Sequence, residues 1–182
     1  MLRWLSGLVL LLCATVAHAG SVASPDGRIV ATLAIDNEGK AIYSVTLDGA
    51  PLLAESVLGF NLTDEDPLRR NFAIVAETAD SADTRWGQPW GERQWVVDRH
   101  NELAVTFRQQ DPAAREFTVR MRVFDDGFGF RYEFPGRADK PETRIAEELT
   151  EFNFARNGSA WWVQAGDWNR YEQIYQHTAI EA

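Results

Sequence analysis

The chain of 182 residues has a single cysteine, Cys13, so no disulfide can form within it. Its stability must therefore come from the burial of side chains. Histidine is almost as scarce, since only His100 and His177 lie beyond residue 19. These two absences exclude a zinc site built from three histidines or from thiolates.

Several sequence signatures of catalysis are also missing. The chain has no Gly-x-Ser-x-Gly segment, which argues against serine hydrolase chemistry, and no Gly-x-x-x-x-Gly-Lys phosphate loop. Asp36-Asn37-Glu38-Gly39 resembles the start of a calcium-binding loop, but the twelfth position would be Leu47 instead of a glutamate. This excludes an EF-hand and leaves a turn.

Length and charge restrict the function further. The chain is too short for a (β/α)8 barrel, which needs about 250 residues, and for a two-domain dinucleotide enzyme. Basic residues are in deficit, with 18 Lys and Arg against 27 Asp and Glu, which disfavours nucleic acid and anionic lipid as partners. A hydrophobic fraction of 45% indicates a folded domain.

The N-terminus has the three parts of a secretory signal peptide. Arg3 provides the positive charge, residues 4–16 form an apolar run, and Ala17-His18-Ala19 provides the cleavage site. The run is too short to span about 30 Å of hydrocarbon, and no other segment comes close, so no membrane anchor is expected. We predict a signal peptide over residues 1–19, a domain over residues 20–182 and a location in the bacterial periplasm.

The rest of the chain alternates apolar and polar residues with period two. Residues 29–47 predict a β-hairpin closed by the turn at residues 36–39, and no window holds a long helical stripe. An all-β antiparallel sandwich is the predicted architecture. Residues 160–163 predict a buried strand with no closing strand after it, and residues 168–175 are the best helical candidate. The other predicted strands are 57–62, 72–77, 94–97, 103–108, 117–124 and 128–134.

Tryptophans form two clusters in the sequence. A large aromatic ring is more often part of a core than of a binding site, so we expect most of these rings to be buried. Exposed rings could stack on sugars. The clusters are Trp86, Trp90 and Trp95, and Trp161, Trp162 and Trp168.

Five motifs together resemble the N-terminal domain of glycoside hydrolase family 97. They occur in the same order as in that family and extend over residues 21–182. The motifs are Ser24-Pro25-Asp26-Gly27, Trp90-Gly91-Glu92, Arg99-His100-Asn101-Glu102-Leu103, the segment 123–132, and Tyr171-Glu172-x-x-Tyr175.

The resemblance implies a galactose-mutarotase-like β-supersandwich. Family members are exo-acting α-glucosidases or α-galactosidases that require calcium, and their catalytic residues lie on a following (β/α)8 barrel, which is absent here. We expect an N-terminal module that packs on such a barrel, shapes its pocket for α-linked oligosaccharides and is inactive alone, with no catalytic residue of its own. The family's domain continues further, so this one is expected to be incomplete at its C-terminal end, with an exposed strand edge.

The resemblance also implies that Glu172 is a calcium ligand. Calcium takes oxygen ligands from separate segments, so a carboxylate from a neighbouring domain can complete its shell. Glu92 and Glu102 are expected to accept hydrogen bonds, with Arg93 and Arg99 nearby in sequence. The segment 125–127 predicts a hairpin turn in which Gly127 supplies a positive φ.

Two other functions remain open from the sequence. The chain could be a stand-alone carbohydrate-binding module that uses a tryptophan cluster as its platform. It could also be a structural or interaction domain whose barrel-facing apolar surface binds a protein partner. Fold-level resemblance carries architecture better than function.

Overall fold

The structure is a computed structural model that describes residues 20–138, 140–166, 169 and 172–180. The predicted signal peptide, Trp168 and Tyr171 lie outside the described residues. All regular secondary structure in the described part is β-strand, and this part holds no helix long and apolar enough to cross a membrane. The strands are β1 Gly20–Ala23, β2 Ile29–Ile35, β3 Ala41–Leu47, β4 Ala50–Val57, β5 Phe60–Leu62, β6 Phe72–Gly87, β7 Trp95–Gln109, β8 Glu116–Phe124, β9 Gly127–Glu133, β10 Ile145–Glu148, β11 Ser159–Trp162 and β12 Gln176–Ala179.

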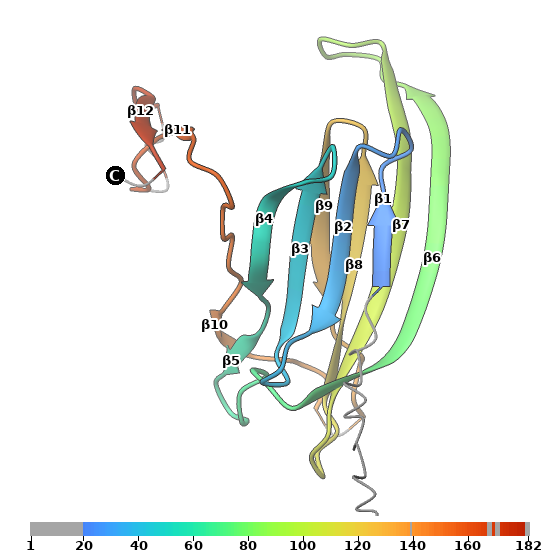
Figure 1. Ribbon diagram of the computed structural model, residues 1–182, viewed down its shortest axis with the longest axis vertical. Helices are drawn as coiled ribbons and strands as arrows, with labels where there is room; N and C mark the ends of the chain where they lie inside the picture. Colours follow the sequence, from blue (N-terminus) through green and yellow to red (C-terminus); the bar gives the residue numbers. More distant parts are fainter. Residues whose placement is uncertain (1–19, 139, 167–168, 170–171, 181–182) are drawn as a thin grey trace, which may run out of the picture.

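Two antiparallel four-stranded sheets form the body of the molecule (Figure 1). One has the order β1-β2-β3-β4 and the other β6-β7-β8-β9, so each strand pairs with its neighbour in sequence. The short pairs β10-β5 and β11-β12 complete the topology. This arrangement confirms the all-β antiparallel fold expected from the sequence.

The alternating pattern places the core between the sheets. On β8, Phe117, Val119 and Met121 are fully buried while the intervening residues face outward. Phe117 packs edge-on against Phe60 and Tyr132, with ring centroids 5.8 Å apart in both pairs. Edge-to-face packing of aromatic rings adds about 0.5–1.5 kcal/mol per pair beyond the burial of their area. Phe60 lies on β5, and Tyr132 lies on β9 in the same sheet as Phe117. Between the two four-stranded sheets, Tyr43 of β3 packs against Phe130 of β9 with ring centroids 5.3 Å apart, so aromatic contacts join the sheets without a covalent link.

The turns follow from local hydrogen bonding. Asp36 Oδ1 accepts the backbone N–H groups of Glu38 and Lys40 at 2.8 Å, and Gly39 has a φ of 75°, which confirms a turn at residues 36–39. Asp125 and Asp126 connect β8 to β9, as expected. The positive φ predicted for Gly127 is wrong, because Gly127 is already the first residue of β9 and pairs with Phe124.

Some strands differ in length from the prediction. The predicted strands 94–97 and 103–108 are parts of a single strand, β7, because the polar residues between them all pair with β6, and Asn101 and Glu102 pair with β8 as well. The predicted strand 57–62 is split between β4 and β5, with Leu58 and Gly59 in the break.

The C-terminal region corrects the prediction of a buried strand. β11 is exposed, and β12 pairs with it as a closing strand that the sequence pattern did not reveal. Figure 1 shows this pair standing apart from the two sheets, which explains why Trp161 is 68% exposed. Residues 172–175 are irregular, so the described part of the predicted helix 168–175 is not helical.

The break between β4 and β5 generates a stability prediction. A Cβ atom at Gly59 would lie 2.6 Å from the backbone oxygen of Leu68, which accepts the N–H of Phe60. Gly59→Ala should therefore lower the free energy of unfolding by about 1–3 kcal/mol, as measured by urea denaturation. Gly127→Ala is the control, since nothing lies within 4 Å of its Cβ position, and it should change stability by less than about 0.5 kcal/mol. Equal stability of the two variants would contradict the prediction.

Candidate functional site

The first tryptophan cluster lies at the end of the β6-β7 hairpin. Trp90 is 81% exposed, and Trp86 and Trp95 are about half exposed. The expectation that these rings belong to the core is wrong, because the end of the hairpin extends beyond the opposing sheet and so beyond the core (Figure 1).

The hairpin end is held in place by its own contacts. The guanidinium of Arg85 lies 4.1 Å from the ring centroid of Trp95, and the same ring covers Gly87 across the β6-β7 pair. Gln88 Nε2 donates to the carbonyl of Arg93 at 2.7 Å and closes the loop. Trp95 is thus fixed, while Trp90 presents its ring to the solvent.

Trp161 and Trp162 of the second tryptophan cluster lie in a segment that we call the C-terminal arm, which comprises the described residues between 152 and 180. The ring of Trp161 stacks on His177 with centroids 4.2 Å apart and an interplanar angle of 9°. Trp162 Nε1 donates to Thr178 Oγ1 at 3.1 Å, so both contacts run between β11 and β12. Burial of these two tryptophans in a core is therefore also a wrong expectation. Further large apolar side chains of the arm are exposed: Phe152, Phe154, Ile174 and Tyr175.

Glu172 lies in the arm, in the irregular segment between β11 and β12, with its side chain exposed. The described part of the chain holds no group of three or more His, Cys, Asp or Glu that could bind a metal ion. Calcium takes six to eight oxygen ligands, and one carboxylate supplies at most two. The described residues therefore fit the role of a single contributed ligand and do not form a complete calcium site.

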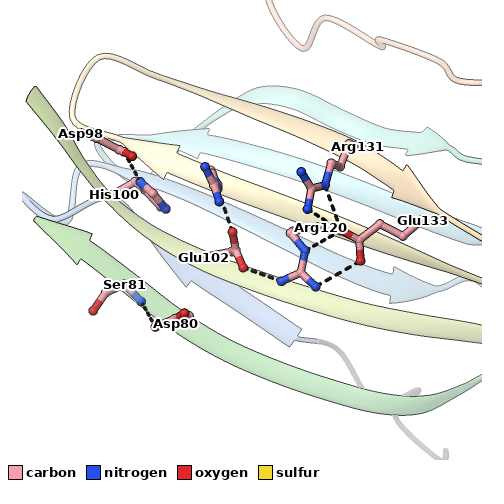
Figure 2. Close-up of polar contacts among 9 residues, drawn as sticks. Asp80, Ser81, Asp98, His100, Glu102, Arg120, Arg131 and Glu133 are labelled. Carbon is pink, nitrogen blue, oxygen red and sulfur yellow. Dashed lines mark hydrogen bonds and ion pairs between the residues drawn. The ribbon is translucent and has the colours of Figure 1, made fainter. Parts of the chain in front are cut away.

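A third feature, which the sequence did not reveal as a group, is a set of charged side chains on the outer face of the β6-β9 sheet (Figure 2). Glu102 of β7 is 6% exposed and His100 is 4% exposed, although both face away from the core between the sheets. Asp98 Oδ1 lies 2.5 Å from His100 Nδ1. The ring of Phe124 packs beside the imidazole, with ring centroids 5.1 Å apart.

The arginines that pair with Glu102 come from β8. Arg122 donates to Glu102 at 2.7 Å, and Arg120 donates to both Glu102 and Glu133. Figure 2 shows Glu133 continuing the chain of contacts to Arg131 of β9. Glu102 accepts arginine hydrogen bonds as expected. Its partners differ from the sequence neighbours Arg93 and Arg99, because the β7-β8 register places Arg122 directly opposite Glu102.

The network keeps its carboxylates ionised. Hydrogen bonds from Arg120 and Arg131 lower the pKa of Glu133 to about 2. Burial opposes ionisation of Glu102, but the hydrogen bonds from Arg122 and Arg120 prevail and lower its pKa. The same contacts raise the pKa of Arg120. Permanently charged groups of this kind suit ion pairing and ligand binding better than proton transfer, which needs a pKa close to the working pH.

Comparisons with known proteins show which family the chain resembles. A family model described as "Glycosyl-hydrolase 97 N-terminal" matches residues 22–182. The chain is similar to a glycoside hydrolase family 97 enzyme from Pseudoalteromonas sp. strain K8, solved in complex with panose and with acarbose. The identity is 40% and the TM-score 0.80, over 87% of this chain and 24% of that chain. A β-arabinopyranosidase structure is similar at 28% identity with a TM-score of 0.75, over 86% of this chain and 26% of that chain. The chain thus spans about a quarter of the length of these solved proteins.

The lowered pKa values predict a loss of stability in acid. Glu133 titrates at about 2 in the folded chain against 4.5 ordinarily, and contacts with Arg137 and Lys140 lower the pKa of Glu65 to about 2 as well. Their contribution is fully present above pH 4.5 and should be lost as the pH falls from about 4.5 to 2.

Urea denaturation at a series of pH values checks this. Glu133→Gln should be less stable than the unmodified chain at pH 7 and should lose less stability between pH 4.5 and 2. Glu92→Gln, at the exposed hairpin end, is the control and should follow the unmodified chain. Parallel pH curves for Glu133→Gln and the unmodified chain would contradict the prediction.

Proposed function

This chain belongs to glycosyl hydrolase family 97, as the family's N-terminal domain, and we propose that it serves a secreted α-glycosidase whose catalytic residues lie outside it. The family match over residues 22–182 supports this role, as does the coverage of about a quarter of the related enzyme. That enzyme binds panose and acarbose, which supports an α-linked oligosaccharide as the substrate of the complete protein.

The exposed aromatic surface of the C-terminal arm is the observation that carries the proposal. Ile174 is 92% exposed, and Phe152, Phe154 and Trp161 are more than half exposed. Exposed large apolar side chains gathered in one segment mark it as a candidate interaction site. We assign this surface to a catalytic (β/α)8 barrel, against which the domain packs and whose pocket it helps to shape.

Glu172 is proposed as the single calcium ligand that the domain contributes. Its exposed position in the arm, beside the proposed barrel-facing surface, supports this role. Calcium bound there would stabilise developing negative charge or activate water. Glu172 itself would contribute one or two oxygens and fix the position of the arm relative to the other ligands.

Export to the bacterial periplasm completes the proposal. The signal peptide is assigned to residues 1–19 and the domain to residues 20–182. The start of the family match at residue 22 supports this boundary.

Complementation tests the function. The purified chain should not hydrolyse an aryl α-glucoside or α-galactoside by itself. Mixed with the Pseudoalteromonas enzyme from which its own N-terminal quarter has been removed, it should restore hydrolysis. Trp161→Ala should weaken the complex, whereas Trp90→Ala, at the other tryptophan cluster, is the matched control and should not. Turnover by the chain alone would overturn the proposal.

The calcium role has its own test in the same mixture. Glu172→Gln should raise the calcium concentration needed for half-maximal activity about tenfold or more, because a ligand oxygen loses its charge. Glu172→Asp should restore part of the affinity, and Glu92→Gln is the control. An unchanged calcium requirement in Glu172→Gln would show that Glu172 is not the calcium ligand.

A stand-alone carbohydrate-binding module is the second candidate. The exposure of Trp86, Trp90 and Trp95 favours it, because these rings could stack on sugars. Maltotriose would then quench the tryptophan fluorescence of the purified chain. Trp90→Ala should raise the dissociation constant about two- to tenfold without unfolding the chain, whereas Trp161→Ala should not. Absence of quenching would exclude this candidate.

A further inference from the structure

A recess opens in the outer face of the β6-β9 sheet, over β8 and β9. Its volume is about 280 Å³, and Gly129 leaves its floor open, because nothing lies within 4 Å of the position that a Cβ atom would take. Ligand pockets commonly have volumes of about 300–1,000 Å³, so this recess suits a small molecule. The residues that line it are Arg120, Arg122, Phe124, Gly129, Phe130 and Arg131.

The strand register places two arginines next to Gly129 at the floor of the recess. Arg122 lies directly opposite Gly129, and Arg131 lies two residues further along β9, so the pair is related diagonally across the two strands. Diagonal neighbours of this kind are about 7–8 Å apart at the backbone, within reach of one ligand held between long side chains.

The two arginines retain hydrogen-bonding capacity, whereas Arg120 is committed to two carboxylates. Arg122 bonds to Glu102 through Nε only, and within the described part of the chain its two terminal nitrogens have no partner. Its side chain is 45% exposed. Arg131 uses Nε and one terminal nitrogen to contact Glu133, and its side chain is two-thirds exposed.

The local charge differs in sign from that of the whole chain. The guanidinium groups of three arginines carry three positive charges, and the carboxylates of Glu102 and Glu133 carry two negative charges. This group therefore has a net charge of +1, whereas the whole chain has a net charge of −9. The planar fork of an arginine matches the two oxygens of a carboxylate. Phe124, backed by the ring of His100, adds an apolar wall beside the arginines.

We propose that this recess binds the carboxylate of a small acid, with Arg122 and Arg131 donating to its two oxygens over Gly129. The carbon skeleton of the acid would lie against Phe124. A sugar acid is a member of this class, so D-glucuronate is the probe. The site is independent of the proposed function, since neither Glu172 nor the C-terminal arm takes part in it.

Calorimetry on the purified chain at constant ionic strength tests the proposal. D-glucuronate and acetate should both bind with saturation, whereas D-glucose, which has no carboxylate, should not. Inorganic phosphate can also accept bidentate hydrogen bonds from arginine, but it has no carbon skeleton to contact Phe124, so it should bind at least several-fold more weakly than glucuronate. The complementation assay of the proposed function should be unaffected by glucuronate.

Three variants locate the site. Arg122→Gln should raise the dissociation constant for glucuronate about tenfold or more, as expected for the loss of charge-assisted hydrogen bonds. Gly129→Val should abolish binding by filling the floor of the recess. It should fold, because the position is free of contacts and has no positive φ. Arg108→Gln is the matched control, since Arg108 lies on the same face with 48% exposure but pairs with Glu116 outside the recess.

The remaining outcomes overturn the proposal. Absence of saturable glucuronate binding would show that the arginines only stabilise the sheet. Equal binding of glucose would assign a neutral ligand, and equal binding of phosphate would remove the preference for a carboxylate. Binding that survives in folded Gly129→Val would place the acid elsewhere on the chain.

Discussion

The aromatic packing around Phe117 is the interaction on which the rest of the structure depends. Phe117 is fully buried between the two sheets and contacts Phe60, Phe107 and Tyr132. With one cysteine in the whole chain, no disulfide can replace these contacts. The inner face of β8 therefore fixes the register of β7 and β9 on either side of it, and a shift by one residue would expose its apolar set.

The same register places the charges on the outer face. When Phe117 and Val119 face inward, Arg120 and Arg122 must face outward, and Arg122 lies opposite Glu102 on β7 and Gly129 on β9. A half-buried charge without a partner would lower the stability of the fold. The strand pairing avoids this, because it places carboxylates next to the arginines. The ion network and the open recess over Gly129 are thus consequences of core packing on the other side of the sheet.

The sequence predicts what depends on local pattern and misses what depends on long-range geometry. Alternation over residues 117–124 gives both faces of β8, and Asp36 gives its turn, because each signal lies within a few residues. The partners of Glu102 lie 18 and 20 residues away and follow only from strand pairing. Size alone predicts that the tryptophans belong to the core, but Trp90 is 81% and Trp161 68% exposed. The family resemblance could be recognised from the sequence alone, because its motifs follow one another along the chain in the same order as in the family.

The two exposed aromatic surfaces differ in how they are supported. The end of the β6-β7 hairpin continues long strands of the body and is held by Arg85 over Trp95, so it is prearranged for contact. The pair β11-β12 has only its own strands for backbone pairing and stands apart from both sheets (Figure 1). Ordering a segment costs conformational entropy, so a partner that covers the exposed rings would add to the contacts that hold this pair. Since Glu102 and Glu133 are held ionised by arginines, these two carboxylates suit ion pairing and ligand binding better than proton transfer.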